Sequence, residues 1–261
     1  MRKVIEIAKK IEEKAPKWLK ESYDNVGLMV GSEEKKVQKV LFSLDCTLDV
    51  IEEAVEKKAD LIVTHHPLLF KKPSSINEED LQGKKIIELI KNNISLYSCH
   101  TNLDNAYQGI NDTIVEVLGF DHGIIMEPKN GDEKNGTGRL IKMEKEKQLN
   151  DIVKLVKDKL NIKNLRIARG KDTVKTIAVI NGSGQDYFYM AKNMEADCII
   201  TGDTTYHFVS DFKEMNISII DAGHFNTEYI PFFKCISFLE DEFRDIEFIY
   251  SDKSMDPYEF V

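Results

Sequence analysis

The sequence lacks cysteine pairs, long apolar runs and an excess of basic residues. Its four cysteines are scattered inside apolar segments without C-x-x-C spacing, a pattern that predicts buried reduced thiols in a cytoplasmic protein. No apolar run approaches the length of a transmembrane helix, so no membrane association is expected. Residues 1–14 repeat apolar residues at helical spacing with charges between them, which predicts a surface helix and not a secretory signal.

Several common ligand-binding motifs are also absent. There is no G-x-x-x-x-G-K-[ST] phosphate loop, no G-x-G-x-x-G motif and no serine in a nucleophile-elbow context. The formal net charge is -9 and no lysine block forms a clear basic patch, which counts against simple nucleic-acid binding. The 261 residues, 42% hydrophobic and 31% charged, suit a globular protein of one large or two smaller domains.

Alternating strand and helix patterns predict an α/β fold. Strand patterns at 39–45, 59–66 and 94–100 are separated by helical patterns at 47–59 and 84–93, an order that predicts parallel strands. The segment from about Asp121 to Gly138 is rich in Gly, Asn and Asp, and we expect a loop there between two lobes, residues 1–125 and 126–261. A strand at 138–143, a helix at 149–160 and a strand at 165–170 should follow.

The second half repeats the first. Residues 40–64 align without a gap on residues 177–201, which places A-D-L-I-V-T-H-H over A-D-C-I-I-T-G-D. Later, N-I-S-L-Y-S-C-H-T-N-L-D matches N-I-S-I-I-D-A-G-H-F-N-T-E with one inserted residue, so that His224 falls on His100 and Glu228 on Asp104. We therefore expect an internal duplication: two pseudo-symmetric, related α/β lobes with mixed, largely parallel sheets and a dinuclear metal site between them.

The apolar strand pattern of residues 59–64 ends abruptly at His65 and His66, followed by Pro67. Neighbouring side chains on an extended chain point in opposite directions, so one metal ion cannot easily take both rings, whereas two adjacent ions could. A core histidine beside a histidine at a strand end is the alternative interpretation. Further ligands elsewhere in the chain are needed to decide between the two.

Other histidines and carboxylates also follow predicted strands, at the sheet edge where open parallel sheets bind ligands. The positions where chemistry is expected are His65, His66, His100, Asp104, Asp203, His207, His224 and Glu228. Of these, we predict five metal ligands: His65, His66, Asp104, His224 and Glu228. Three imidazoles and two carboxylates exceed the four ligands of a structural zinc and suit two divalent ions, with Asp104 and Glu228 as bridging candidates.

The remaining histidines have several alternative roles. His100 and His207 are candidates for catalytic proton carriers or supporting groups, and either could instead be structural, while His122 is expected to be solvated. Nitrogen and oxygen ligands without sulfur fit zinc, iron, manganese or cobalt, and the sequence does not rank them. Asn181 to Gly184 follow a strand pattern, and their amides could cradle a phosphate or simply form a tight turn.

Four separated motifs resemble the GTP cyclohydrolase I type 2 homolog family, also called the NGG-interacting-factor-like proteins. The motifs are A-P-K-W-L-K-E-S-Y-D-N-V-G-L-M-V-G at 15–31, T-H-H-P-L-L-F at 64–70, S-C-H-T-N-L-D at 98–104 and G-H-F-N-T-E at 223–228. The resemblance implies two related α/β lobes, a homohexameric ring and two metal ions held by residues matching the five predicted ligands. Longer members insert an extra domain between the halves, so this chain resembles the short form.

The resemblance also implies an activity, hydrolytic opening of the guanine ring of GTP by a metal-held hydroxide. A non-catalytic ring that binds metal, nucleic acid or a protein partner is one alternative. A metal-dependent phosphoesterase acting on nucleotides is another. The sequence alone leaves all three open.

Overall fold

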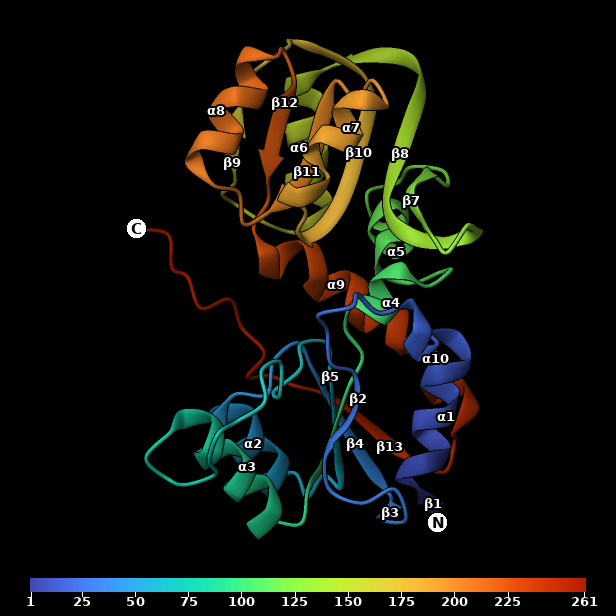
Figure 1. The fold of residues 1–261 in the computed structure, drawn as a ribbon, viewed down its shortest axis with the longest axis vertical. Coiled ribbons are helices and arrows are strands. Elements are labelled where there is room, and N and C mark those ends of the chain that lie inside the picture. The colour runs from blue at the N-terminus through green and yellow to red at the C-terminus, as the bar shows by residue number, and fades with distance from the viewer. The chain divides into compact units, whose positions relative to one another are not determined.

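The computed structural model describes residues 1–261, which divide into two compact units. Unit 1 comprises residues 1–103 and 236–255, and unit 2 comprises residues 104–235 and 256–261. Each unit is built on a sheet of its own with helices packed against it (Figure 1). The expected α/β class with two mainly parallel sheets is therefore confirmed.

The sheet of unit 1 has five strands. Its order is β13-β4-β5-β6-β2, in which the first four strands are mutually parallel and β2 forms an antiparallel edge. The strands are β4 (Lys39–Ser43), β5 (Leu61–Thr64), β6 (Ser95–Ser98), β13 (Glu247–Tyr250) and β2 (Gly27–Val30). Every residue of β5 and β6 is buried, as expected for central parallel strands covered on both faces.

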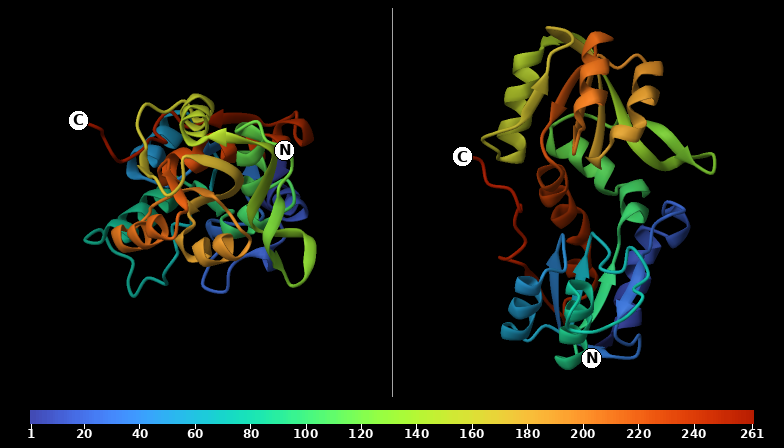
Figure 2. Two further views of the ribbon diagram at one scale, coloured as in Figure 1. Left: turned by 90° about the horizontal axis from the view of Figure 1, so that it is seen from above. Right: turned by 60° about the vertical axis from the view of Figure 1, so that its left-hand side comes forward.

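The helices of unit 1 are α1 (Val4–Lys14), α2 (Leu48–Glu56), α3 (Leu81–Lys91) and α10 (Phe238–Glu242), with a 3₁₀ turn η1 (Lys17–Leu19) and the short strands β1 (Arg2–Lys3) and β3 (Lys36–Val37). Helices α2 and α3 lie on the side of the sheet away from α1 (Figure 2, right). Both helices have a side-chain N-cap. Thr47 Oγ1 accepts a hydrogen bond from Val50 N at 3.1 Å, and Asp80 Oδ2 accepts one from Gly83 N at 2.9 Å.

The sheet of unit 2 has six strands in the order β7-β8-β10-β11-β12-β9. Strands β10 (Thr173–Ser183), β11 (Cys198–Gly202) and β12 (Ser218–Asp221) are parallel, while β7 (Ile124–Lys129), β8 (Asp132–Gln148) and β9 (Arg166–Ala168) are antiparallel to their neighbours. This arrangement leaves the parallel strands in the middle of the sheet, where both faces can be covered.

Helices cover both faces of the second sheet. Helices α5 (Ile110–Val117) and α6 (Leu149–Leu160) share one apolar cluster with it, and α7 (Phe188–Asn193) and α8 (Tyr206–Glu214) share another. The other helical segments are α4 (Thr101–Asn105), η2 (Gln185–Tyr187) and α9 (His224–Ile236). None of the helices in the chain combines the length and hydropathy that crossing a bilayer requires.

The strand pairing is the same in the two sheets at the positions that the sequence repeat aligns. Val40 pairs with Leu61 in unit 1, and Ile177 pairs with Cys198 in unit 2, each at the position the alignment gives. The turns before the repeated strands also correspond, since Lys58 and Glu195 both have positive φ, as do Asn93 and Asn216. The aligned segments thus adopt the same local structure, while the duplication that would explain them stays a prediction.

The middle of the chain differs from expectation. Most of the segment expected to be a loop at 121–138 is a hairpin of β7 and β8, which turns through Asn130 and Gly131, both with positive φ. An Asn-Gly pair is the turn that best matches the twist of two antiparallel strands, so the composition that suggested a loop belongs to a hairpin and its turn.

The division into units also differs from the expected lobes 1–125 and 126–261. Helix α5 packs through Ile114, Val115 and Leu118 into the core of the second sheet, so it belongs to unit 2. Strand β13 returns from the end of the chain to pair with β4 and belongs to unit 1. Neither long-range pairing is visible as a local pattern in the sequence.

We predict that a buried ion pair holds α5 to the second sheet. Arg139 of β8 is 1% exposed, and its Nε donates to Asp112 of α5. The substitution Asp112→Asn should lower the free energy of unfolding by about 3 kcal/mol, because it leaves a buried guanidinium without its counter-charge. Urea unfolding monitored by circular dichroism measures this change.

The matched control is Glu144→Gln, which removes an exposed carboxylate from the same strand and should change stability by less than about 0.5 kcal/mol. An equally small effect of Asp112→Asn would contradict the proposed role of the ion pair.

Candidate metal centre

Three histidines gather at the carboxyl ends of two adjacent strands of unit 1. His65 and His66 follow β5, and His100 follows β6 after one intervening residue. One ring nitrogen of each lies within 4.8 Å of those of the other two, and the ring centroids are 4.9–5.6 Å apart. The chain turns after β5, so the rings of His65 and His66 both lie beside His100, while the expectation that they bind two separate ions stays a prediction.

The rings of His65 and His66 are each fixed through Nδ1. His65 is fully buried, and its Nδ1 lies 2.9 Å from the main-chain oxygen of Cys99. The Nδ1 of His66 lies 2.9 Å from Oδ1 of Asp45. A carbonyl oxygen can only accept, so Nδ1 of His65 carries the proton. This tautomer makes Nε2 the nitrogen that can coordinate a metal, which is the arrangement usual for metal-binding histidines.

His100 is fixed in the same way by a buried carboxylate. Its Nδ1 lies 2.8 Å from Oδ1 of Asp24, which is 6% exposed. Burial raises the pKa of Asp24, but hydrogen bonds from His100 and Thr101 outweigh this and lower the pKa to about 2. The sequence placed His100 among catalytic candidates, whereas its position in the three-histidine group makes it equally suited to hold a metal ion.

In unit 2 the side-chain amide of Asn181 links the carboxylates of Asp104 and Glu228. Nδ2 of Asn181, at the end of β10, donates to Oδ1 of Asp104 at 2.8 Å and to Oε1 of Glu228 at 3.0 Å. One oxygen of each carboxylate lies within 4.8 Å of one of the other, and Glu228 is 3% exposed. Two carboxylates this close repel each other unless a proton or a cation is shared between them. This pair is therefore a suitable anchor for a metal ion.

His224 completes this group at the start of α9. Its Nε2 lies 3.1 Å from Oε2 of Glu228, one helical turn later, and its Nδ1 lies 2.8 Å from Oδ2 of Asp203. Asp203 has a φ of 52°, a conformation that Asp tolerates better than most residues. His224 is thus oriented through Nδ1 by a carboxylate, as His66 and His100 are.

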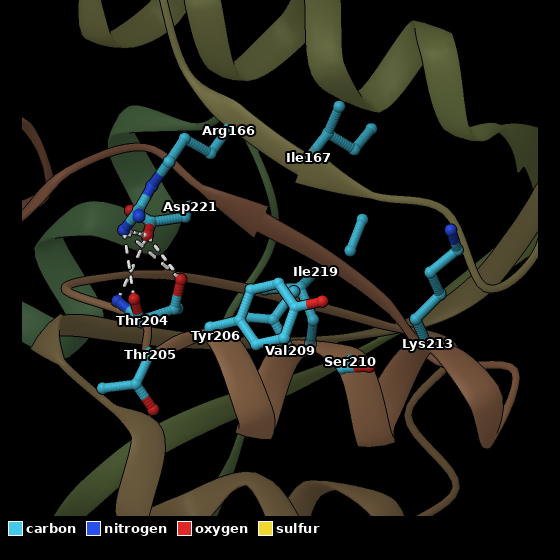
Figure 3. Close-up of a pocket in the computed structure, with 11 residues that line it drawn as sticks. Arg166, Ile167, Thr204, Thr205, Tyr206, Val209, Ser210, Lys213, Ile219 and Asp221 are labelled. Carbon is cyan, nitrogen blue, oxygen red and sulfur yellow. Dashed lines mark hydrogen bonds and ion pairs between the residues drawn. The ribbon is translucent and has the colours of Figure 1, made fainter.

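A hydrogen-bond network links the segment that precedes His224 to the segment that follows Asp203. Asp221 at the end of β12 accepts from Gly223 N at 3.0 Å and from Thr204 N and Oγ1 at 3.1 and 2.6 Å. Arg166 of β9 pairs with the same carboxylate at one end of a pocket of about 340 Å³ (Figure 3). Thr204 follows Asp203 in the chain, and Gly223 precedes His224. The network therefore holds in place both partners of the contact between Asp203 and His224.

The other two histidines lie outside these groups. His207 is exposed in the first turn of α8, where its ring contacts that of Tyr206 with centroids 5.3 Å apart. His122 is exposed before β7, as expected of a solvated residue. Neither belongs to a group of residues that could hold a metal, and the catalytic role suggested for His207 stays a prediction.

The donor atoms of both groups fit a divalent transition metal. They are imidazole nitrogens and carboxylate oxygens, which suit zinc, iron, manganese or cobalt. The four cysteines are buried and not joined by disulfides, and burial raises the pKa of Cys46 to about 12, so it favours the neutral thiol. The histidine and carboxylate groups could hold a metal ion, with oxygen and nitrogen as the ligand atoms.

Four supporting residues were not given these roles from the sequence. The sequence shows Asp24 only as part of the motif at 15–31, predicts Asp45 at the end of a strand and Asn181 in a possible phosphate cradle, and gives Asp203 as a position where chemistry is expected without a role. Each binds a partner that is 21 to 77 positions away in the sequence. The one available signal was the polar residue at or just beyond a strand's carboxyl end, shared by Asp45, Asn181 and Asp203.

These features define the class of protein as a two-unit α/β protein in which strand ends and the helices that follow them present oriented histidines and paired carboxylates. The chain belongs to the Duf34/NIF3 (NGG1p interacting factor 3) family, whose model matches residues 2–257. A protein of Clostridium perfringens named "GTP cyclohydrolase 1 type 2 homolog" is 52% identical over 261 residues, covering 99% of this chain and 100% of its own.

Two further relatives allow the fold and the chain length to be compared. The solved structure of the Staphylococcus aureus hypothetical protein SA1388 superposes with a TM-score of 0.90 at 29% identity, covering 99% of both chains. A "GTP cyclohydrolase 1 type 2 homolog" of Listeria innocua is 26% identical over 361 aligned positions, which span 96% of this 261-residue chain and 96% of its own. The alignment is 100 positions longer than this chain, so this chain lacks at least that many residues of the Listeria protein.

We predict that Gly182 must lack a side chain for Glu228 to keep its place. Gly182 has a φ of +57°, and a Cβ there would lie 2.3 Å from Oε1 of Glu228. The substitution Gly182→Ala should therefore displace this carboxylate and weaken metal binding about tenfold or more, as loss of a supporting contact does. Isothermal titration with Zn²⁺ or Mn²⁺ measures the affinity.

The control is Gly131→Ala in the β7–β8 turn, where φ is +77° and a Cβ would meet nothing within 4 Å. It introduces comparable backbone strain, about 1 kcal/mol, without touching a candidate ligand. Equal metal affinity in both variants would contradict the prediction that Gly182 is needed to keep Glu228 in place.

Proposed function

We propose that the protein is a metal-dependent hydrolase that opens the guanine ring of GTP. The observation that carries the proposal is the pair of carboxylates, Asp104 and Glu228, that Asn181 holds together beside the oriented imidazole of His224. The names of the relatives at 52% and 47% identity support the choice of reaction. The five predicted ligands, His65, His66, Asp104, His224 and Glu228, would together hold two divalent ions.

Bound divalent ions would lower the pKa of a coordinated water and stabilise negative charge that develops on the substrate. The chain's own residues supply orientation. Asp45 and Asp203 keep the Nδ1 atoms of His66 and His224 occupied, and Asn181 keeps two carboxylates in place. His100, held by Asp24, is the candidate for moving a proton or for a further ligand. Pre-oriented groups of this kind cost no rearrangement during the reaction.

The reaction is tested by formate release from GTP, because one water opens the imidazole ring to a formamide and a second water releases its carbon as formate. Protein is stripped of metal with a chelator, reloaded separately with zinc, iron, manganese or cobalt, and incubated with GTP. We expect formate from at least one reloaded form and its loss in Asp104→Ala, because that variant removes one of the paired carboxylates. Asp151→Ala, which removes an exposed carboxylate from α6, should retain the activity.

Background-level formate from both the unmodified protein and Asp104→Ala, with every metal, would remove the proposal. Phosphate release without formate would favour the alternative of a nucleotide phosphoesterase. Metal-independent DNA binding that weakens steeply with salt and survives Asp104→Ala would favour a non-catalytic nucleic-acid-binding ring, an alternative that the net charge of -9 opposes.

We also propose that the protein assembles as a homohexameric ring, a proposal that rests on the family resemblance. Light scattering coupled to size-exclusion chromatography should give six times the 30.0 kDa mass of the chain. A monomeric or dimeric mass at micromolar concentration would contradict it.

A further inference from the structure

We propose that Tyr23 and Phe70 form a stacking surface for a planar heteroaromatic ring beside the three-histidine group of unit 1. The two side chains are 65% and 44% exposed, so both rings are open to a ligand. Their ring centroids are 6.2 Å apart at an interplanar angle of 62°, so a planar ring that stacks on one of them meets the other edge to face. The Phe70 ring lies 6.3 Å from that of His100 at 83°.

Both aromatic residues are carried by segments that are tied to the histidines. Tyr23 precedes Asp24, the carboxylate that holds Nδ1 of His100 at 2.8 Å. Nδ2 of Asn25 donates at 2.7 Å to the main-chain oxygen of Leu69, the residue before Phe70. The two segments are therefore bonded to each other and to the histidine group. A ring placed on this surface would be held at a defined distance from the candidate metal ligands.

The charge next to this surface indicates the class of ligand. Lys71 and Lys72 directly follow Phe70, and both are exposed. Aromatic faces bind nucleobases with little preference for sequence because every base presents a π face, and lysine is a common partner for phosphate. A purine nucleotide offers both parts, a flat base for Tyr23 and Phe70 and phosphates for the lysines. The identification of the ligand as a purine nucleotide rests on the proposed function.

Equilibrium binding to the metal-loaded protein separates base recognition from catalysis. The probes are GTP, guanosine and inorganic triphosphate, measured by isothermal titration calorimetry. Tyr23→Leu and Phe70→Leu should each weaken binding of GTP and guanosine about tenfold, the effect expected for loss of one stacked or edge-to-face aromatic contact, and leave triphosphate binding unchanged. The conservative variants Tyr23→Phe and Phe70→Tyr should restore most of the affinity.

A matched control and a metal measurement exclude indirect effects. Trp18→Leu removes another exposed aromatic side chain of unit 1, 51% exposed, and should leave all three affinities unchanged. Metal content should be the same in every variant. If guanosine binding depends on Tyr23 and Phe70 but no formate is released, the stacking surface stands and the proposed hydrolase fails.

Three results would overturn the inference. The first is guanosine affinity in Tyr23→Leu and Phe70→Leu equal to that of the unmodified protein. The second is an equal loss of triphosphate affinity, which would indicate damage to the segment and not loss of a stacked base. The third is absence of measurable guanosine and GTP binding to the unmodified metal-loaded protein.

Discussion

An imidazole that is hydrogen-bonded through one ring nitrogen can offer only the other to a metal ion, and this constraint governs both groups of candidate ligands. In unit 1 an oxygen lies within 2.9 Å of Nδ1 in each of the three histidines. In unit 2 the same is true of His224. A histidine without such a partner can rotate and exchange tautomers, so fixing the ring reduces the freedom lost when a metal binds. The Nδ1 hydrogen bond that these histidines share is stronger support for a metal site than the number of histidines.

The fold supplies these contacts through the ends of parallel strands. In both units the central strands are parallel, so their carboxyl ends lie along one edge of the sheet, and polar residues that follow them come together there. The first residue beyond β5 and the third beyond β12 are both histidines, and β10 ends near Asn181. The interiors of these strands are buried and apolar, so they form a rigid base for the groups at their ends.

Much of this arrangement could be predicted from the sequence because it depends on local patterns. Apolar runs marked the central strands, and the repeat gave a register that matches the strand pairing of both sheets. The supporting residues could not be predicted, since the Asp24–His100 and Asn181–Asp104 contacts join positions 76 and 77 apart. The composition of residues 121–138 predicts a loop where the structure has a hairpin, because Gly, Asn and Asp are typical both of loops and of the Asn-Gly turn that joins β7 to β8.

Anomalous X-ray diffraction from metal-loaded crystals tests the central claim most directly. Data collected on both sides of the absorption edge of the bound metal locate each ion independently of the protein atoms. The orientation of the rings predicts metal peaks about 2.0–2.1 Å from Nε2 of His65, His66 and His224, with each Nδ1 still bonded to its oxygen. Peaks bonded to Nδ1, or fully loaded protein without a peak at these histidines, would contradict it.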